Sequence, residues 1–311
     1  MSCLLRRPLR SALPLLVPLA AALAAAGGAA PPKPAPKTTP KAAAVPLPVP
    51  APGAHHAPPG YTLVWADEFY REGRPDPLRW TAETHRNKDG WHNAEAQYYS
   101  AGDPANAREE RGVLAIEARA GAPGTAAARP ADWGKQLYTS ARLTSGPKGT
   151  WTYGWFEVRA KVACGRGIWP AIWMLPADPA RKWPDDGEID IMEHVGHNPG
   201  VVHHSVHTKA FNHAIKTEKT AVFPLADACA AMHRYQLHWT ADRITMGVDD
   251  TVRFTFARAG TDRARWPFDK PMRLLLNVAV GGTWGGEKGI DPAAFPARME
   301  VDYVRVYQRR K

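Results

Sequence analysis

The chain has 311 residues, of which 44% are hydrophobic and 23% are charged. A chain of this length forms one large domain with room for additional segments. The formal net charge is +10, but six of the basic residues fall within the first 41 positions. The remaining sequence has no block of mixed basic and aromatic residues of the kind that binds nucleic acid, so we expect no nucleic-acid partner.

Residues 1–30 have the pattern of a secretory signal peptide. Arg6, Arg7 and Arg10 precede an apolar run over residues 12–30 that ends in small residues suited to cleavage. An uncleaved membrane anchor is the alternative, because the run approaches spanning length, although its two prolines argue against a membrane helix. We expect a secreted or periplasmic monomer that has no membrane contact after cleavage.

Residues 31–59 are rich in proline and alanine and predict an extended, disordered linker. The folded domain is then residues 60–311. Its sequence consists of short alternating segments separated by turn residues, without convincing helical periodicity. The expected strands are residues 63–65, 113–118, 137–144, 152–162, 168–174, 188–194, 201–208, 235–240, 243–248, 251–257, 272–280 and 298–307. This pattern predicts an all-β sandwich, with a helical turn within 224–232.

Two cysteines remain after removal of the signal, Cys164 and Cys229. In an oxidising compartment we expect them to form a disulfide, and two separate buried thiols are the alternative. Cys164 has no histidine close in sequence, so neither a cysteine nucleophile nor a zinc site is indicated.

The segment Glu188-Ile-Asp-Ile-Met-Glu193 places three acids among apolar residues, which favours a strand over a solvated loop. Glu188 and Asp190 then share one face, whereas Glu193 would point to the other face of a regular strand. One extra residue in a β-bulge at Ile191–Met192 returns Glu193 to the acid face. Water must reach that face, because burying several charges would be too costly.

Carboxyl groups this close together are not easily ionised at the same time, so one of them keeps its proton near neutral pH. Such a pair has the groups needed to cleave a glycosidic bond. The alternatives are a calcium site or a charged strand face. Trp169 and Trp173 lie four positions apart on the preceding strand, and flat rings beside acids suit the apolar faces of sugars, although tryptophan also fills sandwich cores.

These residues resemble the active-site strand of glycoside hydrolase family 16, in its laminarinase-like branch with the bulged pattern Glu-x-Asp-x-x-Glu. The resemblance extends over about residues 61–308, in the same order as in the family. Its other segments are 91–99, 138–143, 153–160, 206–213, 277–286 and 301–307. It implies a concanavalin A-like jelly roll of two curved antiparallel sheets with a substrate cleft on the concave face.

The resemblance implies a retaining mechanism with Glu188 as nucleophile, Glu193 as acid/base and Asp190 as the residue that orients the nucleophile. It implies no cofactor for catalysis. The expected substrate-binding residues are Asn93, Arg159, Trp169, Trp173, His207 and Trp284, with Gln97 and His213 as further candidates. His207 is expected near the acid/base or as a structural histidine, and Arg159 at a sugar hydroxyl or in an ion pair.

Many members of the family carry a structural calcium away from the chemistry. The matching positions are Glu68, the backbone carbonyl near Gly112, and Asp302, whose oxygen atoms suit that ion.

The implied function is endo-hydrolysis of β-1,3-glucans such as laminarin, and of mixed-linkage β-glucans. One alternative is a galactan hydrolase, although only Arg142, Arg159 and Arg166 lie near the motif in sequence. A glucan-binding protein without activity is another, but it should lack one of the two glutamates. Transglycosylation is a third.

Overall fold

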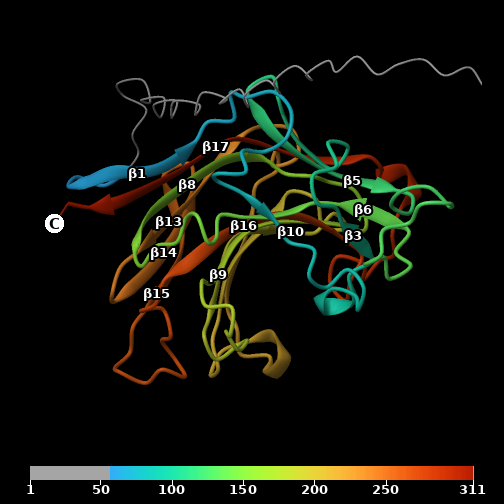
Figure 1. The fold of residues 1–311 in the computed structure, drawn as a ribbon. Helices are drawn as coiled ribbons and strands as arrows, with labels where there is room; N and C mark the ends of the chain where they lie inside the picture. Colours follow the sequence, from blue (N-terminus) through green and yellow to red (C-terminus); the bar gives the residue numbers. More distant parts are fainter. Residues whose placement is uncertain (1–56, 311) are drawn as a thin grey trace, which may run out of the picture. The chain divides into compact units, whose positions relative to one another are not determined.

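The computed structural model describes residues 57–310, which fold into two stacked β-sheets (Figure 1). The predicted signal peptide and nearly all of the predicted linker lie outside the described residues. The predicted all-β class is confirmed. Within residues 57–310 the helical structure consists of three short 3₁₀ turns, His92–Ala94, His213–Ile215 and Pro292–Ala294. No helix in this part of the chain is long and apolar enough to cross a membrane.

One sheet has ten strands in the order β15-β14-β13-β8-β17-β5-β6-β3, with β1 on β17 and β4 on β5. All its pairings are antiparallel except the short β3–β6 pair. Figure 1 shows β15, β14, β13, β8 and β17 side by side. The strands are β1 (Tyr61–Asp67), β3 (Gln97–Tyr99), β4 (Ala107–Glu110), β5 (Val113–Ala120), β6 (Tyr138–Ser140), β8 (Gly154–Lys161), β13 (His233–Trp239), β14 (Arg243–Val248), β15 (Thr251–Ala257) and β17 (Ala297–Arg309).

The other sheet has seven strands in the order β12-β11-β10-β9-β16-β7-β2 and contains the acidic segment as a central strand. Its strands are β2 (Thr81–Ala82), β7 (Arg142–Thr144), β9 (Ile168–Pro176), β10 (Glu188–His194), β11 (Val201–His207), β12 (Lys219–Pro224) and β16 (Met272–Val280). A central strand is hydrogen-bonded on both sides, so its side chains are held firmly relative to both neighbours.

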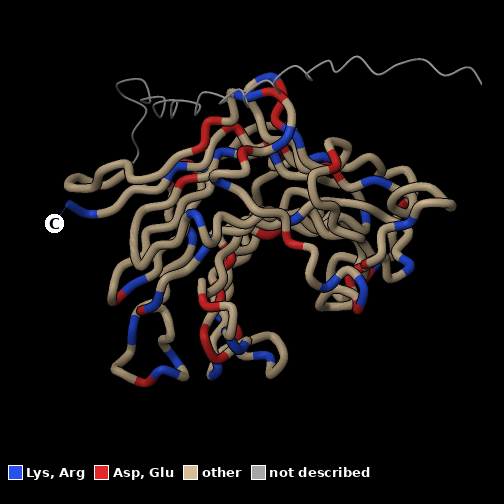
Figure 2. The backbone as a smooth tube through the Cα atoms, viewed as in Figure 1, with Lys and Arg blue, Asp and Glu red and all other residues tan. Residues whose placement is uncertain are grey.

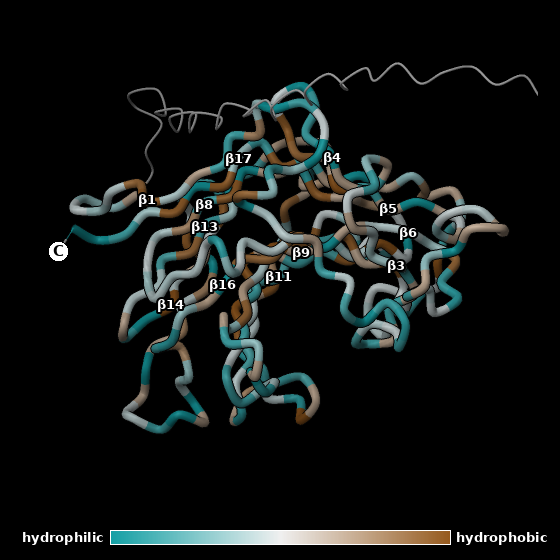
Figure 3. Tube along the Cα trace, viewed as in Figure 1, coloured by the Kyte–Doolittle hydropathy of each residue, from teal (hydrophilic) through white to brown (hydrophobic). Residues whose placement is uncertain are grey.

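The core fills the space between the sheets. Ile189, Ile191 and Met192 of β10 are fully buried there with Ile172 of β9 and Leu276 of β16. In Figure 3 the hydrophobic stretches lie mainly on the strands and the hydrophilic ones mainly on the loops. One face of the seven-stranded sheet therefore packs on the core, and the opposite face is available for polar residues.

The sequence predicted most strands but not all their boundaries. The expected strand 137–144 is two strands, β6 and β7, which belong to different sheets. The short strands β2, β3, β4 and β12 were not expected. The predicted helical turn within 224–232 is a series of hydrogen-bonded turns, in which Ala230 and Ala231 donate to the carbonyl of Asp227. Short strands carry too little alternation to be recognised without their partners.

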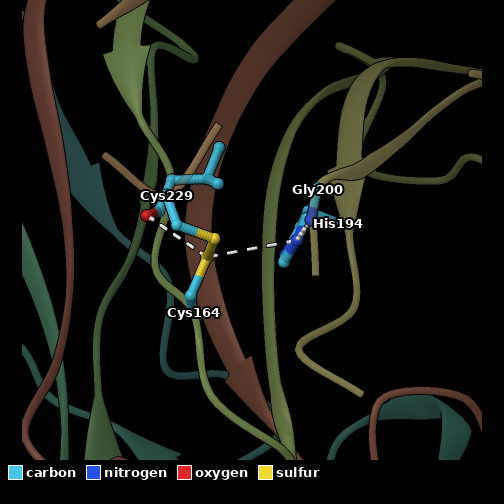
Figure 4. Close-up of a disulfide and its surroundings, with 5 residues drawn as sticks. Cys164, His194, Gly200 and Cys229 are labelled. Atoms are coloured by element: carbon cyan, nitrogen blue, oxygen red, sulfur yellow. Dashed lines mark hydrogen bonds between the residues drawn. A yellow bond between two sulfur atoms is a disulfide. The ribbon is translucent and has the colours of Figure 1, made fainter. Parts of the chain in front are cut away.

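The predicted disulfide between Cys164 and Cys229 is present (Figure 4). It joins the loop after β8 to the loop before β13. His194, the last residue of β10, lies against it, with Nε2 4.0 Å from Sγ of Cys164 and accepting a hydrogen bond from the backbone N–H of Gly200 at 3.3 Å. The disulfide therefore packs against the end of the strand that carries the acids.

Candidate active site

The bulge predicted in β10 is present. Asp190 is paired with Ser205 of β11, and the next paired residue is Glu193, opposite His203, so the register shifts between the two acids. The pairing with β9 shifts at the same place. The extra residue brings Glu193 to the face that Glu188 and Asp190 share, and all three acids line one cleft.

The cleft lies on the outer face of the seven-stranded sheet and has a volume of about 780 Å³. Its wall combines strand residues of β9, β10 and β16 with residues from the segment 83–95 and the loop 176–187. Of the residues predicted from the sequence, it contains Asn93, Trp169, Trp173, Glu188, Asp190, Glu193 and His213. An elongated polar polymer fits such an open groove lined by rings and acids.

The three acids are unequally buried. Asp190 is 2% exposed, whereas Glu188 and Glu193 are partly exposed to the cleft. Burial, and then the nearby charge of Asp190, raise the pKa of Glu188 to about 8. Burial raises the pKa of Asp190 to about 7. The same two causes hold the pKa of Glu193 well above its usual range. The cluster therefore keeps protons at neutral pH and titrates as a unit.

His207 of β11 contacts Asp190, with Nε2 3.3 Å from Oδ2. Polar atoms of Glu188, Asp190 and His207 all lie within 4.8 Å of one another. His207 thus lies in the acid cluster as expected: its direct partner is the central aspartate, and its charge also acts on Glu193. Its ring also packs against His213, which lies in the cleft wall beside Trp183.

Trp169 positions Glu193 directly. Its indole Nε1–H donates to Oε1 of Glu193 at 3.1 Å. Trp284 packs edge-on against Trp169, with ring centroids 5.2 Å apart, and against His203 at 4.8 Å. Trp284 is not part of the cleft wall. Trp284, expected as a substrate-binding residue, is half-buried and supports the ring of Trp169.

Trp173 presents a ring that its surroundings fix in place. Its Nε1–H donates to Oδ1 of Asn277 at 2.7 Å, and the Asn277 amide donates to the hydroxyl of Tyr99 at 3.1 Å. The guanidinium of Arg142 lies 4.6 Å from the ring centroid, a favourable cation–π geometry. Sequence reasoning missed Asn277, which lines the cleft, because its strand partner is far away in the chain.

Gln97 is a structural residue and not a sugar contact. It is fully buried, donates to Glu95 at 2.8 Å and accepts from the backbone N–H of Val280 at 2.8 Å. Glu95 itself lines the cleft, and burial raises its pKa. Asn93 also lines the cleft and adopts a left-handed backbone conformation (φ 58°), which asparagine tolerates better than most residues.

Arg159 was wrongly expected in the cleft. It lies on β8 of the ten-stranded sheet, outside the cleft wall, with Nη1 2.5 Å from Oδ2 of Asp302. The resemblance supplied this residue, and the sequence alone could not show to which sheet its strand belongs. The ion-pair alternative is the one the structure contains.

The expected calcium ligands are committed to other partners. Both carboxylate oxygens of Glu68 accept from Arg305, at 2.8 and 2.9 Å, and Asp302 holds Arg159. Gly112 lies in the turn between β4 and β5 with φ 77°. With both carboxylates neutralised by arginines, this donor set does not fit a calcium ion as it stands.

A group that sequence reasoning missed lies at one end of the cleft. It consists of Glu83 and three arginines, Arg142, Arg181 and Arg273. Only Arg142 had been noted, because the four residues come from separate parts of the chain. Elsewhere, positive and negative residues are interleaved along the chain (Figure 2).

Comparisons with known proteins match this chain to a family model, a curated relative and two solved structures. A family model described as "Glycosyl hydrolases family 16" matches residues 85–305. The beta-glucanase of Rhodothermus marinus is 47% identical over 258 residues, which cover 80% of this chain and 86% of that protein. The crystal structure of SCLam, a non-specific endo-beta-1,3(4)-glucanase from family GH16, matches with a TM-score of 0.78 and 50% identity, covering 82% of this chain and 94% of that one. A glutamate-to-serine variant of SCLam, with the same TM-score and identity over 81% and 96%, has 1,3-beta-D-cellobiosyl-glucose at its active site.

Proposed function

The chain belongs to glycosyl hydrolases family 16, and from this membership we propose that it hydrolyses internal β-1,3 bonds of laminarin-like glucans and of mixed-linkage β-glucans. The observation that carries the proposal is the bulge in β10, which puts Glu188, Asp190 and Glu193 on one face of an open cleft. Two carboxyl groups on either side of a bound sugar are what glycoside hydrolysis needs, and this chemistry uses no cofactor.

In the first step Glu193 donates its proton to the leaving glycosidic oxygen while Glu188 attacks the anomeric carbon. The raised pKa of Glu193 supplies that proton at neutral pH. Glu188 must be ionised to attack, so in the reacting form the proton shared by the neighbouring pair resides on Asp190. The products are a glycosyl ester on Glu188 and a free sugar end.

In the second step a water molecule replaces the departed sugar. Glu193, now ionised, takes a proton from this water, which attacks the anomeric carbon and releases Glu188. The two inversions give net retention of configuration. The indole N–H of Trp169 stays bonded to Glu193 through both steps, and it favours the ionised form that acts as base.

The rings of Trp169 and Trp173 border the acids in the cleft wall. The axial C–H bonds of a β-linked glucose unit are apolar and pack on such rings, while Asn93 and Asn277 offer amides to its hydroxyls. Neutral glucans therefore match the immediate surroundings of the acids.

Reducing-sugar release from laminarin, lichenan, barley β-glucan and agarose tests the proposal, with Glu188→Gln as the inactive control. We expect rapid cleavage of laminarin, cleavage of the mixed-linkage glucans and none of agarose. Cleavage of agarose alone would replace the glucanase with a galactanase. Tight binding of laminarin without cleavage by the unmutated protein would instead leave a recognition module.

We also propose that the protein is exported as a monomer to the periplasm or the medium. The basic and apolar pattern of residues 1–30 supports this, and so does the disulfide, since such bonds persist in oxidising compartments. N-terminal sequencing of the mature protein should find a start within residues 27–31, and size-exclusion chromatography should give the mass of one chain.

We propose that activity does not depend on calcium. The predicted ligands Glu68, Gly112 and Asp302 belong to the ten-stranded sheet and its turns, not to the cleft wall. Treatment with EGTA should therefore leave activity on laminarin unchanged at 25 °C. Loss of activity that only calcium restores would show that the ion shapes the cleft.

A further inference from the structure

One end of the cleft contains a buried acid held between two arginines. Glu83 is 8% exposed, and its two carboxylate oxygens are taken by different partners. Nε of Arg142 lies 2.7 Å from Oε2, and Nη2 of Arg273 lies 2.8 Å from Oε1. Although burial alone would raise it, these arginines bring the pKa of Glu83 below its usual value. One negative charge is therefore shared by two positive ones.

A third arginine joins this group from the loop between β9 and β10. Arg181 is half-buried and lines the cleft, and it interacts electrostatically with Glu83, with catalytic Glu188 and with Asp178 of its own loop. Within residues 57–310 its side chain has no acidic partner within 4 Å, and the buried Nε of Arg273 has no hydrogen-bond partner. Donors at this end of the cleft are thus left without acceptors.

Three arginines and one glutamate leave a formal charge of +2 in a partly enclosed place, and the exposed Lys182 adds to it at the rim. Burial disfavours this charge, and the same burial lowers the pKa values of both Arg181 and Arg273. Neutral sugar hydroxyls would supply acceptors but no compensating charge. Buried charges without counter-charge are costly, so the arrangement is best satisfied by a ligand that carries a negative group.

His85 and His92 line the same end of the cleft. Burial is the main cause that lowers both pKa values, and nearby arginines contribute. Both rings are therefore neutral at pH 7 and add hydrogen-bonding groups rather than charge. The recognition of an anion at this end falls to the arginines, whose planar forks suit oxygen pairs of carboxylates and sulfates.

Resting on the proposed glucanase function, we infer that Arg142, Arg181 and Arg273 form a subsite for an oxyanion attached to the glucan, so that the substrate class includes acidic β-glucans. Because Arg181 interacts electrostatically with Glu188, this subsite lies near the nucleophile. The anion would neutralise the positive charge of the three arginines, which Glu83 alone compensates only in part. A carboxylate of a uronate unit and a sulfate ester share this chemistry.

The test compares kcat/KM on three probes: laminarin, laminarin oxidised at part of its C6 positions to glucuronate, and laminarin sulfate. The measured quantity is the ratio of the value on each acidic probe to the value on plain laminarin, which cancels any general effect on catalysis. We expect Arg181→Gln to lower this ratio about 10-fold in low salt for at least one acidic probe, as the loss of a charged hydrogen bond implies. The probe affected identifies the oxyanion.

Two further variants sharpen the test. Arg181→Lys keeps the charge without the fork and should recover part of the ratio. Arg111→Gln removes one positive charge from the β4–β5 turn, where the side chain is 80% exposed, and should leave the ratio unchanged. An equal fall in Arg111→Gln would show a general charge effect and would overturn the subsite, as would unchanged ratios in Arg181→Gln.

Binding in an inactive protein separates this inference from the proposed function. In Glu188→Gln, isothermal calorimetry should give tighter binding of the acidic probe than of laminarin, with the advantage lost when Arg181→Gln is added. Cleavage of laminarin with no preference for either acidic probe in binding or turnover would overturn the inference and leave the glucanase intact. Failure to cleave any probe, with the binding preference present, would overturn the glucanase and not the subsite.

Discussion

Two regions of the same cleft are built in opposite ways. The acid row comes from six consecutive residues of one central strand, whose register with β9 and β11 sets every side-chain position. The basic group comes from four separate parts of the chain, which contribute Glu83, Arg142, Arg181 and Arg273. The catalytic residues thus depend on one rigid strand. The residues proposed to bind the anion come from separate segments, so each can be substituted without altering the others.

The electrostatics of the two groups are also opposite. In the acid row, which consists of Glu188, Asp190 and Glu193, burial and like charges raise the pKa values. The cluster therefore remains partly protonated at neutral pH and can donate a proton in catalysis. At the basic end, arginines lower the pKa of Glu83 against the effect of burial, so the charges persist. Burial therefore favours proton transfer where acids lie together and charge recognition where arginines surround an acid.

The largest loss of activity should come from replacing the nucleophile Glu188. Glu188→Gln keeps the shape of the side chain but cannot form the glycosyl ester, and we expect kcat on laminarin to fall on the order of 10⁵-fold. Reducing-sugar assays measure this. In Glu188→Ala, added azide should restore turnover by attacking from the vacated face. Retention of more than about a tenth of the activity in Glu188→Gln would assign the nucleophile elsewhere.

A smaller loss should follow Asp190→Asn, which replaces the central carboxyl group with an amide that cannot ionise. Asp190 is the shared neighbour that raises the pKa values of Glu188 and Glu193, so both should drop. We expect kcat to fall about 10²-fold and the alkaline limb of the pH–rate profile to move to lower pH. A profile that keeps its alkaline limb would mean that Asp190 does not control the acid/base.

At the basic end the main loss should be in stability. Glu83→Gln leaves Arg142 and Arg273 without their acid, and breaking a buried pair costs about 3 kcal/mol. Urea unfolding should measure that loss, while the pH–rate profile keeps its limbs because the acid row is untouched. A shifted pH–rate profile with an unchanged free energy of unfolding would contradict the division of the cleft into a catalytic acid region and a basic region.

The smallest effect concerns stability and pH at the acid row. Folding raises the pKa of Glu188 to about 8 from an ordinary value of 4.5, so the folded state binds this proton more tightly than the unfolded state does. The stabilisation is complete below pH 4.5 and is lost as pH rises through 8. Glu188→Gln avoids the loss and should melt above the wild type at pH 8, with no difference near pH 4.5. A variant less stable than the wild type at pH 8 would contradict the raised pKa.

The sequence was most informative where neighbours in the chain are neighbours in space. The shared face of the acids of β10 and their bulge could be predicted from alternation within one strand. The shared face of Trp169 and Trp173 could be predicted from their spacing on β9, the strand that precedes it in the chain. Family resemblance supplied the roles of Glu188 and Glu193.

The errors arise where side-chain position depends on long-range pairing. Arg159 has the right alternation but belongs to the other sheet, and Gln97 is buried by a backbone contact with Val280. Arg181 and Arg273 carry no local signal, because an arginine in a loop or on a strand is ordinarily solvated. Only the folded chain brings them to Glu83.

The most direct test of the central claim is the anomeric configuration of the first product. Proton NMR of laminarin during early hydrolysis separates the α- and β-anomers before they interconvert. Because Glu188 is placed as a nucleophile and Glu193 as the acid/base, the account predicts that the β-anomer appears first and the α-anomer grows only by mutarotation. Initial appearance of the α-anomer would show inversion by direct water attack and would contradict the roles assigned to both glutamates.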